Sequence, residues 1–200
     1  MRGYPITSTG AASCGLPLRS LALGVRATVE HMRVRVLAEA DLEPALDLFE
    51  EVAAEGRWLA NEPPVDRREV GARWRELVRT GEGTILVAED GGPPAGLAAM
   101  VGLAAPELGM LVRASCRGQG VGDALVRACV AWAEGRGARE VVLHVFPHNV
   151  AAIALYRKHG FVDRGVLRGA YPRRSGERWD AIRMTLPLAG GQRAGSASSM

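Results

Sequence analysis

The stretch Arg117-Gly118-Gln119-Gly120-Val121-Gly122 lies between an apolar run, 108–112, and an alanine-rich amphipathic segment, 123–134. This order predicts a strand, a glycine-rich turn and a helix, which together place unpaired N–H groups and the positive end of a helix dipole at the turn. Glycines let the backbone approach a phosphate closely, because a Cβ would stand in the way. Arg117 adds a multidentate cation, so the stretch predicts a site for a di- or oligophosphate.

Two common phosphate-binding loops do not fit these residues. A P-loop needs a Lys followed by Ser or Thr after its last glycine, whereas Asp123 and Ala124 follow Gly122. A dinucleotide-binding fingerprint that begins at Gly118 needs its third glycine where Asp123 stands. A plain turn between a strand and a helix remains the alternative to a phosphate site.

The composition suits one globular domain with a sizeable core, since 48% of the 200 residues are hydrophobic. The 25 basic and 22 acidic residues give a net charge of +3, and no dense Lys/Arg block indicates a nucleic-acid surface. No apolar run reaches the ~18–20 residues that cross a bilayer. The three cysteines lack metal-ligand spacing and argue for a reducing compartment. We therefore expect a cytoplasmic protein with no nucleic-acid partner, no membrane partner and no metal.

Both ends of the chain differ in composition from its middle. Residues 1–31 are rich in Gly, Ser, Ala and Thr, and polar residues split their apolar segment, 16–25, which argues against a signal peptide. Residues 189–200 are rich in Gly, Ser and Ala. We expect a disordered leader over 1–31, one domain over 32–188 and a disordered tail over 189–200, with Met32 as the natural start.

Hydropathy patterns predict strands and helices that alternate around a mixed sheet, which is layering of the α/β type. Asp41 is expected to cap the first helix, and Asp66 followed by Glu69 to form a capping box for the second. The charged segment 168–178 is expected to be a flexible connection. Strands are expected over 33–37, 84–88, 95–103, 107–113, 141–146, 161–167 and 179–186, and helices over about 41–55, 66–79, 123–134 and 149–159.

A second block follows the glycine-rich stretch after about 30 residues and reads Asn149-x-x-Ala152-x-x-Leu155-Tyr156-x-x-x-Gly160-Phe161. Asn149, Ala152 and Tyr156 fall at i, i+3 and i+7, so they project from one face of a helix. An amide and a phenol on an otherwise apolar face need partners if they are buried. The spacing alone supports an N-cap Asn and a core Tyr as well as it supports a binding site.

Together the two blocks resemble the two hallmark segments of the GCN5-related N-acetyltransferase family, and the likeness spans roughly 32–188. The first block is similar to that family's Arg-x-x-Gly-x-Gly loop, which cradles the pyrophosphate of coenzyme A. The resemblance implies a mostly antiparallel central sheet flanked by helices, and acetyl-CoA as co-substrate. It also implies direct transfer, in a ternary complex, of an acetyl group to a primary amine of a small molecule or a protein N-terminus. A homodimer is a further expectation, because relatives are often dimers.

The resemblance also implies roles for single residues. Asn149 would contact coenzyme A, and Tyr156 would protonate the departing thiolate, whose thiol has a pKa of about 8.5. In the family the strand before the loop splays open and offers backbone N–H groups to the oxyanion of the intermediate, here around Leu111 and Val112. One departure is that Ala114 stands where many relatives have Pro. The expected cofactor-binding residues are Leu111, Val112, Arg117, Gly118, Gln119, Gly120, Val121, Gly122 and Asn149.

The general base is less clear from the sequence. The attacking amine, with a pKa of about 10, must first lose a proton. Glu107 begins the strand that leads to the loop and is expected in this role, directly or through water, because relatives often use a carboxylate there. A solvent-facing strand end is the alternative. His144 is the second candidate, although a His within a central strand is more often a satisfied core residue.

Residues for the acceptor are only weakly indicated. Three carboxylates near Trp58 could attract a cationic amine, or could belong to a charged helix face: Glu51, Glu55 and Glu62. Tyr171 and Asp180 fall in the final hairpin, where relatives place acceptor-contacting loops, and Trp179 is expected to pack. The identity of the amine stays open, since acceptor loops vary independently of the cofactor site.

Three alternatives compete with direct transfer. Cys116 abuts Arg117 and could form an acetyl-cysteine intermediate, but a nucleophilic Cys needs a nearby base and none is identifiable. A module that binds acyl-CoA without turnover is the alternative to an enzyme, and Asn149 and Tyr156 favour the enzyme. A domain that binds the phosphates of another nucleotide is the third possibility.

Overall fold

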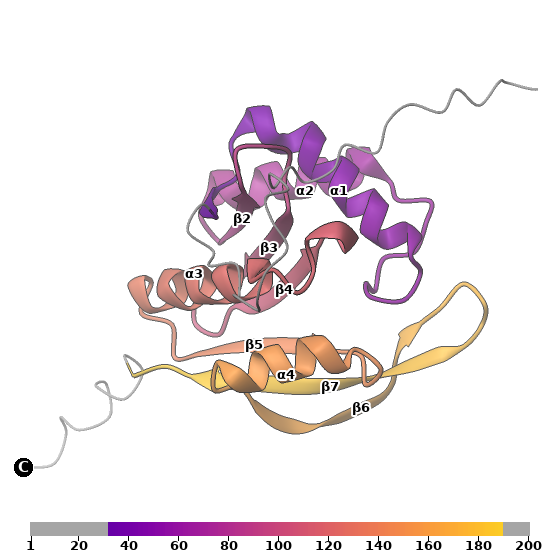
Figure 1. Ribbon diagram of the computed structural model, residues 1–200. Helices are drawn as coiled ribbons and strands as arrows, with labels where there is room; N and C mark the ends of the chain where they lie inside the picture. Colours follow the sequence, from indigo (N-terminus) through magenta and orange to yellow (C-terminus); the bar gives the residue numbers. More distant parts are fainter. Residues whose placement is uncertain (1–31, 190–200) are drawn as a thin grey trace, which may run out of the picture.

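The computed structural model describes residues 32–189, in which seven strands form one sheet with helices against both faces (Figure 1). The predicted leader, 1–31, and all but the first residue of the predicted tail lie outside the described residues. The strands are β1 (Arg33–Val36), β2 (Gly83–Glu89), β3 (Gly96–Val101), β4 (Glu107–Val112), β5 (Glu140–Val145), β6 (Val162–Pro172) and β7 (Arg178–Pro187). The helices are α1 (Leu42–Ala54), α2 (Arg67–Thr80), α3 (Val121–Gly135) and α4 (Val150–Lys158), with short 3-10 turns at Glu39–Asp41 and Ala114–Cys116.

The sheet is mixed and mostly antiparallel, which confirms the predicted fold class. Its strand order is β1-β2-β3-β4-β5-β7-β6, and β4 with β5 is the parallel pair among antiparallel neighbours. This pair is parallel because α3 carries the chain back across the sheet between the two strands, as a parallel crossover requires. The glycine-rich stretch therefore lies at the point where β4 ends and the crossover begins.

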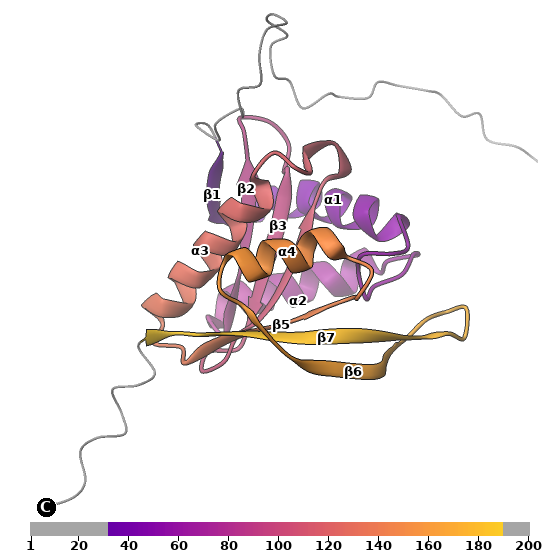
Figure 2. The same cartoon turned by 60° about the horizontal axis from the view of Figure 1, so that its bottom comes forward.

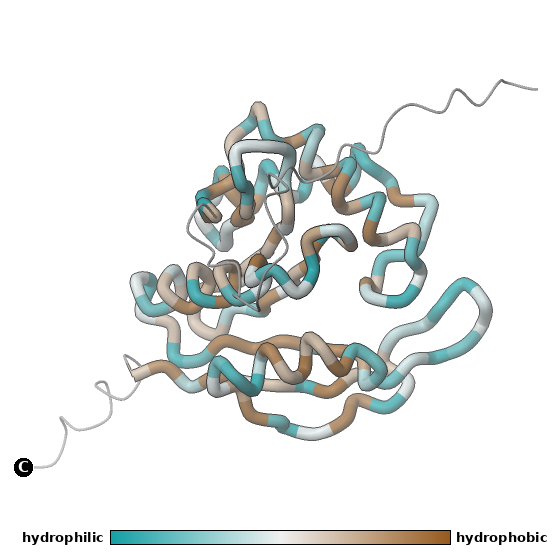
Figure 3. Tube along the Cα trace, in the orientation of Figure 1, coloured by the Kyte–Doolittle hydropathy of each residue, from teal (hydrophilic) through white to brown (hydrophobic). Residues whose placement is uncertain are grey.

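Side chains of β2, β3 and β4 alternate between two hydrophobic cores. Leu97 and Leu111 belong to the core under α1 and α2, whereas Ala98 and Leu108 belong to the core under α3 and α4. The helices thus cover opposite faces of the sheet in pairs, with α3 and α4 on the near side in Figure 2. β5 is apolar along most of its length (Figure 3), in keeping with the central, doubly covered position predicted for it.

The final hairpin corrects one prediction. The segment 168–178 was expected to be a flexible connection, but β6 continues to Pro172 and β7 begins at Arg178. Register shifts at 163/165 and 167/171 let the ladder absorb residues that break the alternation of polar and apolar side chains. The Asp180 carboxylate accepts the Gly169 N–H at 2.7 Å across one of these irregularities. A hydropathy pattern does not report such bulges, so the strand looked shorter than it is.

The two predicted helix caps have different outcomes. Asp66 caps α2 as expected, because its carboxylate accepts the Glu69 N–H at 2.9 Å. Asp41 occupies the N-cap position of α1 but makes no bond to a helical N–H. Its carboxylate instead accepts the Ala38 N–H at 2.7 Å and pairs with Arg35 at 2.8 Å. The Arg35 guanidinium, by this hydrogen bond, lowers the pKa of Asp41 below its ordinary value.

The described part of the chain contains no helix that is both long and apolar enough to span a bilayer. Within residues 32–189 there is also no group of three or more metal-ligating side chains. A cytoplasmic location and a homodimer stay predictions.

Candidate active site

The three glycines of the 117–122 stretch do different things. Gly118 and Gly120 have φ values of 75° and 85°, a left-handed conformation that L-residues with a Cβ rarely adopt. Gly122 has ordinary helical geometry, but a Cβ there would lie 2.9 Å from Leu155 Cδ2. Two glycines therefore shape the loop, and the third allows α3 to approach α4.

The loop presents a run of unpaired backbone donors. Ala124 donates its N–H to the Gly120 carbonyl at 3.0 Å, which begins the helical hydrogen bonds of α3. No hydrogen bond of the described residues uses the N–H groups of 118–123. These donors converge at the positive end of the α3 dipole and form a site for an anion. A phosphate site is thus supported by the backbone as well as by residue types.

Arg117 is held in place from two sides. Its Nη atoms donate to the Glu55 carboxylate at 2.8 and 2.5 Å, and its Nε donates to the Val112 carbonyl at 3.1 Å. Glu55 also accepts the Trp58 indole N–H at 2.5 Å. The Arg117 guanidinium lowers the pKa of Glu55 below its usual range. A phosphate that reaches the loop must therefore share Arg117 with Glu55 or displace that carboxylate.

β4 and β5 form a ladder at one place and then separate. Their paired positions are Glu107 and Val142, beside the bond in which Val142 N–H donates to the Pro106 carbonyl at 3.0 Å. On its other edge β4 pairs with β3 along all six residues. Beyond Leu108 the β5-facing backbone groups of β4 lack a strand partner, which leaves a gap in the sheet.

The gap exposes alternate N–H groups of β4. Arg113 donates to the Ala95 carbonyl of the β3 side at 2.9 Å, so the odd-numbered N–H groups of β4 face β3. Those of Met110 and Val112 face the gap by the same alternation. Leu111 directs its N–H toward β3 and lines the adjoining cavity with its side chain. The N–H groups that face the gap are therefore those of Met110 and Val112, whereas the prediction named Leu111 and Val112.

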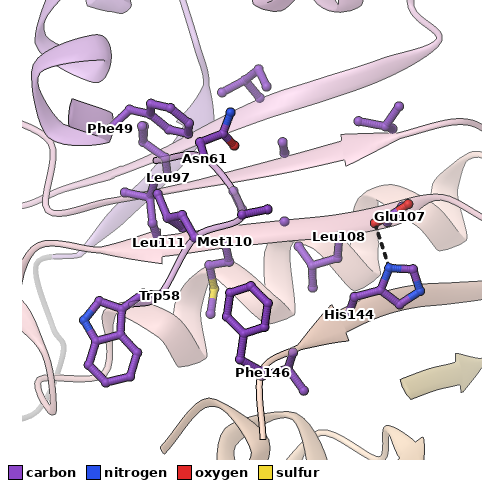
Figure 4. A pocket seen from close by; sticks show the side chains of 18 of the residues that line it. Phe49, Trp58, Asn61, Leu97, Glu107, Leu108, Met110, Leu111, His144 and Phe146 are labelled. Atoms are coloured by element: carbon purple, nitrogen blue, oxygen red, sulfur yellow. Dashed lines mark ion pairs between the residues drawn. The ribbon is translucent and has the colours of Figure 1, made fainter. Parts of the chain in front are cut away.

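A cavity of about 560 Å³ runs through this gap (Figure 4). Leu111 and Gly109 line it on the α1–α2 face of the sheet. Asn149 and Tyr156 line it from the α4 side. Because β4 and β5 have separated, one continuous space reaches both faces of a sheet that would otherwise divide them.

Asn149 and Tyr156 have the structural roles of an N-cap and a core residue, and both also line the cavity. Asn149 is the N-cap of α4, since its Oδ1 accepts the Ala152 N–H at 3.2 Å. The bond uses the oxygen and leaves the amide NH₂ as a donor for a ligand. Tyr156 is buried and packs on Phe161 with ring centroids 5.7 Å apart. Burial raises its pKa, so the hydroxyl keeps its proton.

Glu107, His144 and Tyr171 come together on the other side of the cavity. His144 Nδ1 lies 3.4 Å from Glu107 Oε1 and 3.1 Å from the Tyr171 hydroxyl. The Glu107 side chain is 56% exposed, so water reaches it. Burial, and to a lesser extent Glu107, raises the pKa of Tyr171. The sequence indicated each of these residues but not their contact.

Residues 45–161 match the family described as the acetyltransferase (GNAT) family. The chain belongs to this family. It is 31% identical over 157 residues to glucosamine 6-phosphate N-acetyltransferase 1 of Oryza sativa subsp. japonica, which covers 71% of this chain and 88% of that protein. It is 42% identical over 71 residues, 36% of this chain, to the ribosomal protein bS18 alanine N-acetyltransferase of Escherichia coli, of which the match spans about half, 47%.

Solved structures of the GNAT family share the fold. A phosphinothricin acetyltransferase from Sinorhizobium meliloti, solved in complex with AcCoA, superposes with a TM-score of 0.73 at 24% identity. The alignment covers 81% of this chain and 91% of that protein. The open, helix-flanked sheet is therefore a GNAT sheet.

The GNAT sequence pattern did not reveal Arg173, which is 5% exposed. Its guanidinium donates to three carbonyls of the loop between α1 and α2, at 3.1, 3.0 and 3.2 Å: Gly56, Leu59 and Ala60. The same group lies 4.1 Å from the ring centroid of Trp179. Arg173 thereby ties the wall of the cavity to the β6–β7 hairpin. It lies in the charged segment 168–178, which was expected to be a flexible connection, and no local signal marks it.

The three carboxylates near Trp58 are engaged by arginines. Glu51 pairs with Arg113, and Glu62 lies 3.3 Å from Arg173, while Glu55 pairs with Arg117. None of the three lines the cavity. Among the residues expected for the acceptor, Tyr171 lines it and Asp180 does not.

Cys116 is buried and does not line the cavity. Its hydrogen-bonding neighbour in the described chain is the Ser115 hydroxyl, 3.8 Å away, which is not a base. Within residues 32–189 no base is hydrogen-bonded to this thiol, as its activation would require.

Proposed function

We propose that this GNAT protein transfers the acetyl group of acetyl-CoA to a primary amine of a small molecule or a protein N-terminus, by direct attack in a ternary complex. The observation that carries the proposal is the cavity through the gap between β4 and β5. Asn149 and Tyr156 line it from the α4 side, and Glu107 and His144 line it from β4 and β5. The names of the two curated relatives, both N-acetyltransferases, support the same chemistry.

The residues present fit acetyl-CoA as co-substrate. The free N–H groups of 118–123 and the Arg117 guanidinium suit a pyrophosphate. The free NH₂ of Asn149 and the gap-facing N–H groups of β4 suit the amide-containing arm that follows it. The thioester would then lie in the cavity beside Tyr156.

Backbone donors in the gap would stabilise the reaction's charge. Attack of an amine on a thioester places negative charge on the carbonyl oxygen, and fixed N–H groups stabilise it without reorganisation. Met110 and Val112 hold their N–H groups toward the gap because β3 fixes the other edge of β4. These groups are the proposed oxyanion donors.

Two proton transfers complete the reaction. Glu107 takes a proton from the attacking amine, directly or through water, with His144 in contact to share it. The C–S bond breaks as the new C–N bond is completed, and the sulfur leaves with its electron pair. Tyr156 donates its hydroxyl proton to that sulfur, and burial ensures that the proton is present.

The test is release of free coenzyme A from acetyl-CoA over a panel of amines that includes amino acids, amino sugars, polyamines and peptides with free N-termini. We expect release that depends on one class of amine. A protein that binds acetyl-CoA but releases no thiol with any amine would instead be an acyl-CoA-binding module. Binding of ATP, with no shift of Tm by acetyl-CoA, would show another nucleotide site.

A further inference from the structure

The acceptor side of the cavity has an open floor at Gly109. This glycine lies in the middle of β4, opposite Ala99 of β3, and both residues line the cavity. Its backbone is not left-handed, and a Cβ built on it would meet nothing within 4 Å. Neither conformation nor packing therefore requires a glycine here. A glycine in a strand interior often marks a place where a ligand approaches the backbone, and the empty space above Gly109 suits the acceptor.

Two charged side chains of opposite sign line this space. Glu107 belongs to β4, and Arg73 belongs to α2. Within residues 32–189 Arg73 has no carboxylate within 4.0 Å and no hydrogen-bond partner, whereas three other arginines of α2 are paired and Arg68, also unpaired, does not line the cavity. The paired ones are Arg67, Arg75 and Arg79. Arg73 is thus a cation on the cavity wall whose donors are available.

The carboxylates nearest Arg73 are mostly committed elsewhere. A smaller adjoining hollow is lined by Arg73 together with Glu62, Asp66 and Glu69. Glu62 accepts the Arg174 N–H at 2.7 Å, and Asp66 caps α2. Glu69, one turn before Arg73, is the remaining carboxylate that could compete for it. Glu69 is exposed, and a single exposed carboxylate attracts a cation only weakly, less than an anionic ligand bound to Arg73 would.

The end of the cavity near Arg73 also carries a neutral donor. Asn61 lines both hollows with Arg73. Figure 4 shows Asn61 beside Phe49 and away from the Glu107–His144 pair, with Leu97 and Leu111 near Asn61 and Leu108 near the pair. An acceptor in this space therefore meets an acid, apolar side chains, and a cation with an amide beside it.

Given the proposed acetyl transfer, we propose that the acceptor is a small amine that carries an anionic group, a carboxylate or a phosphoryl oxyanion. Its amine lies at Glu107, and its anion is bound by Arg73 with help from Asn61. A guanidinium matches such oxyanions with paired N–H donors. A polyamine lacks the anion and places further positive charge near Arg73, so the site selects against it.

The test uses acceptors in matched pairs at saturating acetyl-CoA: α-amino acids against their primary carboxamides, and an amino sugar with and without a phosphate. We expect the anionic member to have the higher kcat/KM. Arg73→Gln should lower kcat/KM about tenfold or more for the anion, mainly through KM, and leave the neutral member within about twofold. Arg68→Gln is the control, because Arg68 is an exposed arginine of α2 that does not line the cavity.

The inference is overturned if wild-type protein uses both members of each pair equally, or if Arg73→Gln lowers both to the same extent. Failure of acetyl transfer itself is a separate result, seen as no thiol release from any amine while acetyl-CoA binds. In that case titration calorimetry measures the binding of the same acceptor pairs to the protein saturated with coenzyme A. Tighter binding of the anions that is lost in Arg73→Gln supports the subsite, and equal or absent binding overturns it.

Discussion

Tyr156 and Glu107 reach one cavity from opposite faces of the sheet. Tyr156 comes from α4 and is buried, so water has little access to its hydroxyl. Glu107 lies at the start of β4 with 56% of its side chain exposed. Under the proposed mechanism, the proton taken from the amine can therefore pass to solvent at Glu107. The proton given to the sulfur comes from the buried Tyr156 hydroxyl.

Removal of the Tyr156 hydroxyl should impair the chemical step alone. Tyr156→Phe keeps the ring that packs 5.7 Å from Phe161, so folding should be preserved. We expect kcat to fall about 100-fold, with Tm and the Kd of acetyl-CoA nearly unchanged, because general-acid catalysis contributes on the order of 10²–10⁴. Tyr171→Phe removes a hydroxyl from the acceptor side and serves as the matched variant. A kcat within twofold of wild type in Tyr156→Phe would remove the proposed acid.

At the level of residues, local spacing predicted more of the donor side than of the acceptor side. Asn149 and Tyr156 were found together because helical periodicity places them on one face. The contact of Glu107 with His144 needed the pairing of β4 with β5, which sequence spacing does not specify. Arg173 is buried by carbonyls more than 110 residues away and by Trp179, so its own neighbourhood carried no sign of its role.

At the level of elements, β4 determines what can enter the acceptor side. Gly109→Val places a branched side chain in open space on a strand, where Val is favourable. We expect the KM for the amine to rise at least about tenfold from steric exclusion, while Tm stays within a degree or two. Steady-state kinetics and thermal unfolding measure both. An unchanged KM would show that the acceptor does not lie over Gly109.

Gly122→Ala is the contrasting variant for this test. Its Cβ would lie 2.9 Å from Leu155 Cδ2, so the Leu155 side chain would have to shift or α3 and α4 to separate. We expect it to lose stability on the order of 1–3 kcal/mol, as overpacked sites do. The pair separates a glycine kept for ligand space from one kept for helix contact.

The same two helices are joined by Asp123. Its carboxylate accepts from Lys158 at 2.6 Å and from His159 at 2.9 Å. These bonds, Lys158 first, lower the pKa of Asp123 below its ordinary 3.8. A carboxylate whose pKa is lowered by folding stabilises the folded state at pH values above its unfolded pKa. This stabilisation is lost as pH falls through the folded pKa.

Asp123→Asn should therefore destabilise the protein at pH 7, by roughly 1 kcal/mol since Lys158 is exposed. The difference from wild type should shrink as pH falls below about 4. Urea unfolding at pH 7 and pH 3 measures it. Asp163→Asn is the control, because its ion pair with Arg157 is largely exposed and should contribute little. A difference that is the same at both pH values would contradict the assignment.

Elements whose own residues carry a clear pattern were predicted well. Features that depend on contacts with residues elsewhere in the chain were not. The turn at 117–122 and the helix after it follow from glycines and amphipathic spacing. β6 extends to Pro172 because bulges and the Asp180 carboxylate keep it paired, and neither is visible in hydropathy. Asp41 stands at the predicted N-cap position but makes no cap hydrogen bond, because its carboxylate is taken by Arg35, six residues earlier.

At the level of the whole molecule, the site depends on a break in the sheet. The order of strands and helices predicted a mixed sheet, and the chain's single parallel strand pair in the described region follows from the α3 crossover. The separation of β4 from β5 after one paired position was expected only because of the family resemblance; no residue pattern predicted it. The separation depends on the pairing of β4 with β3 and of β5 with β7, which sets the direction of each strand. Local sequence patterns do not specify these directions.

The central claim is that both substrates meet in this gap, so that the acetyl group passes directly between them. Initial rates measured with acetyl-CoA and the amine both varied test it most directly, with Cys116→Ala measured alongside. We predict double-reciprocal lines that intersect, and a Cys116→Ala variant as active as wild type. Parallel lines, together with an acetylated protein in the absence of amine, would contradict direct transfer through the gap.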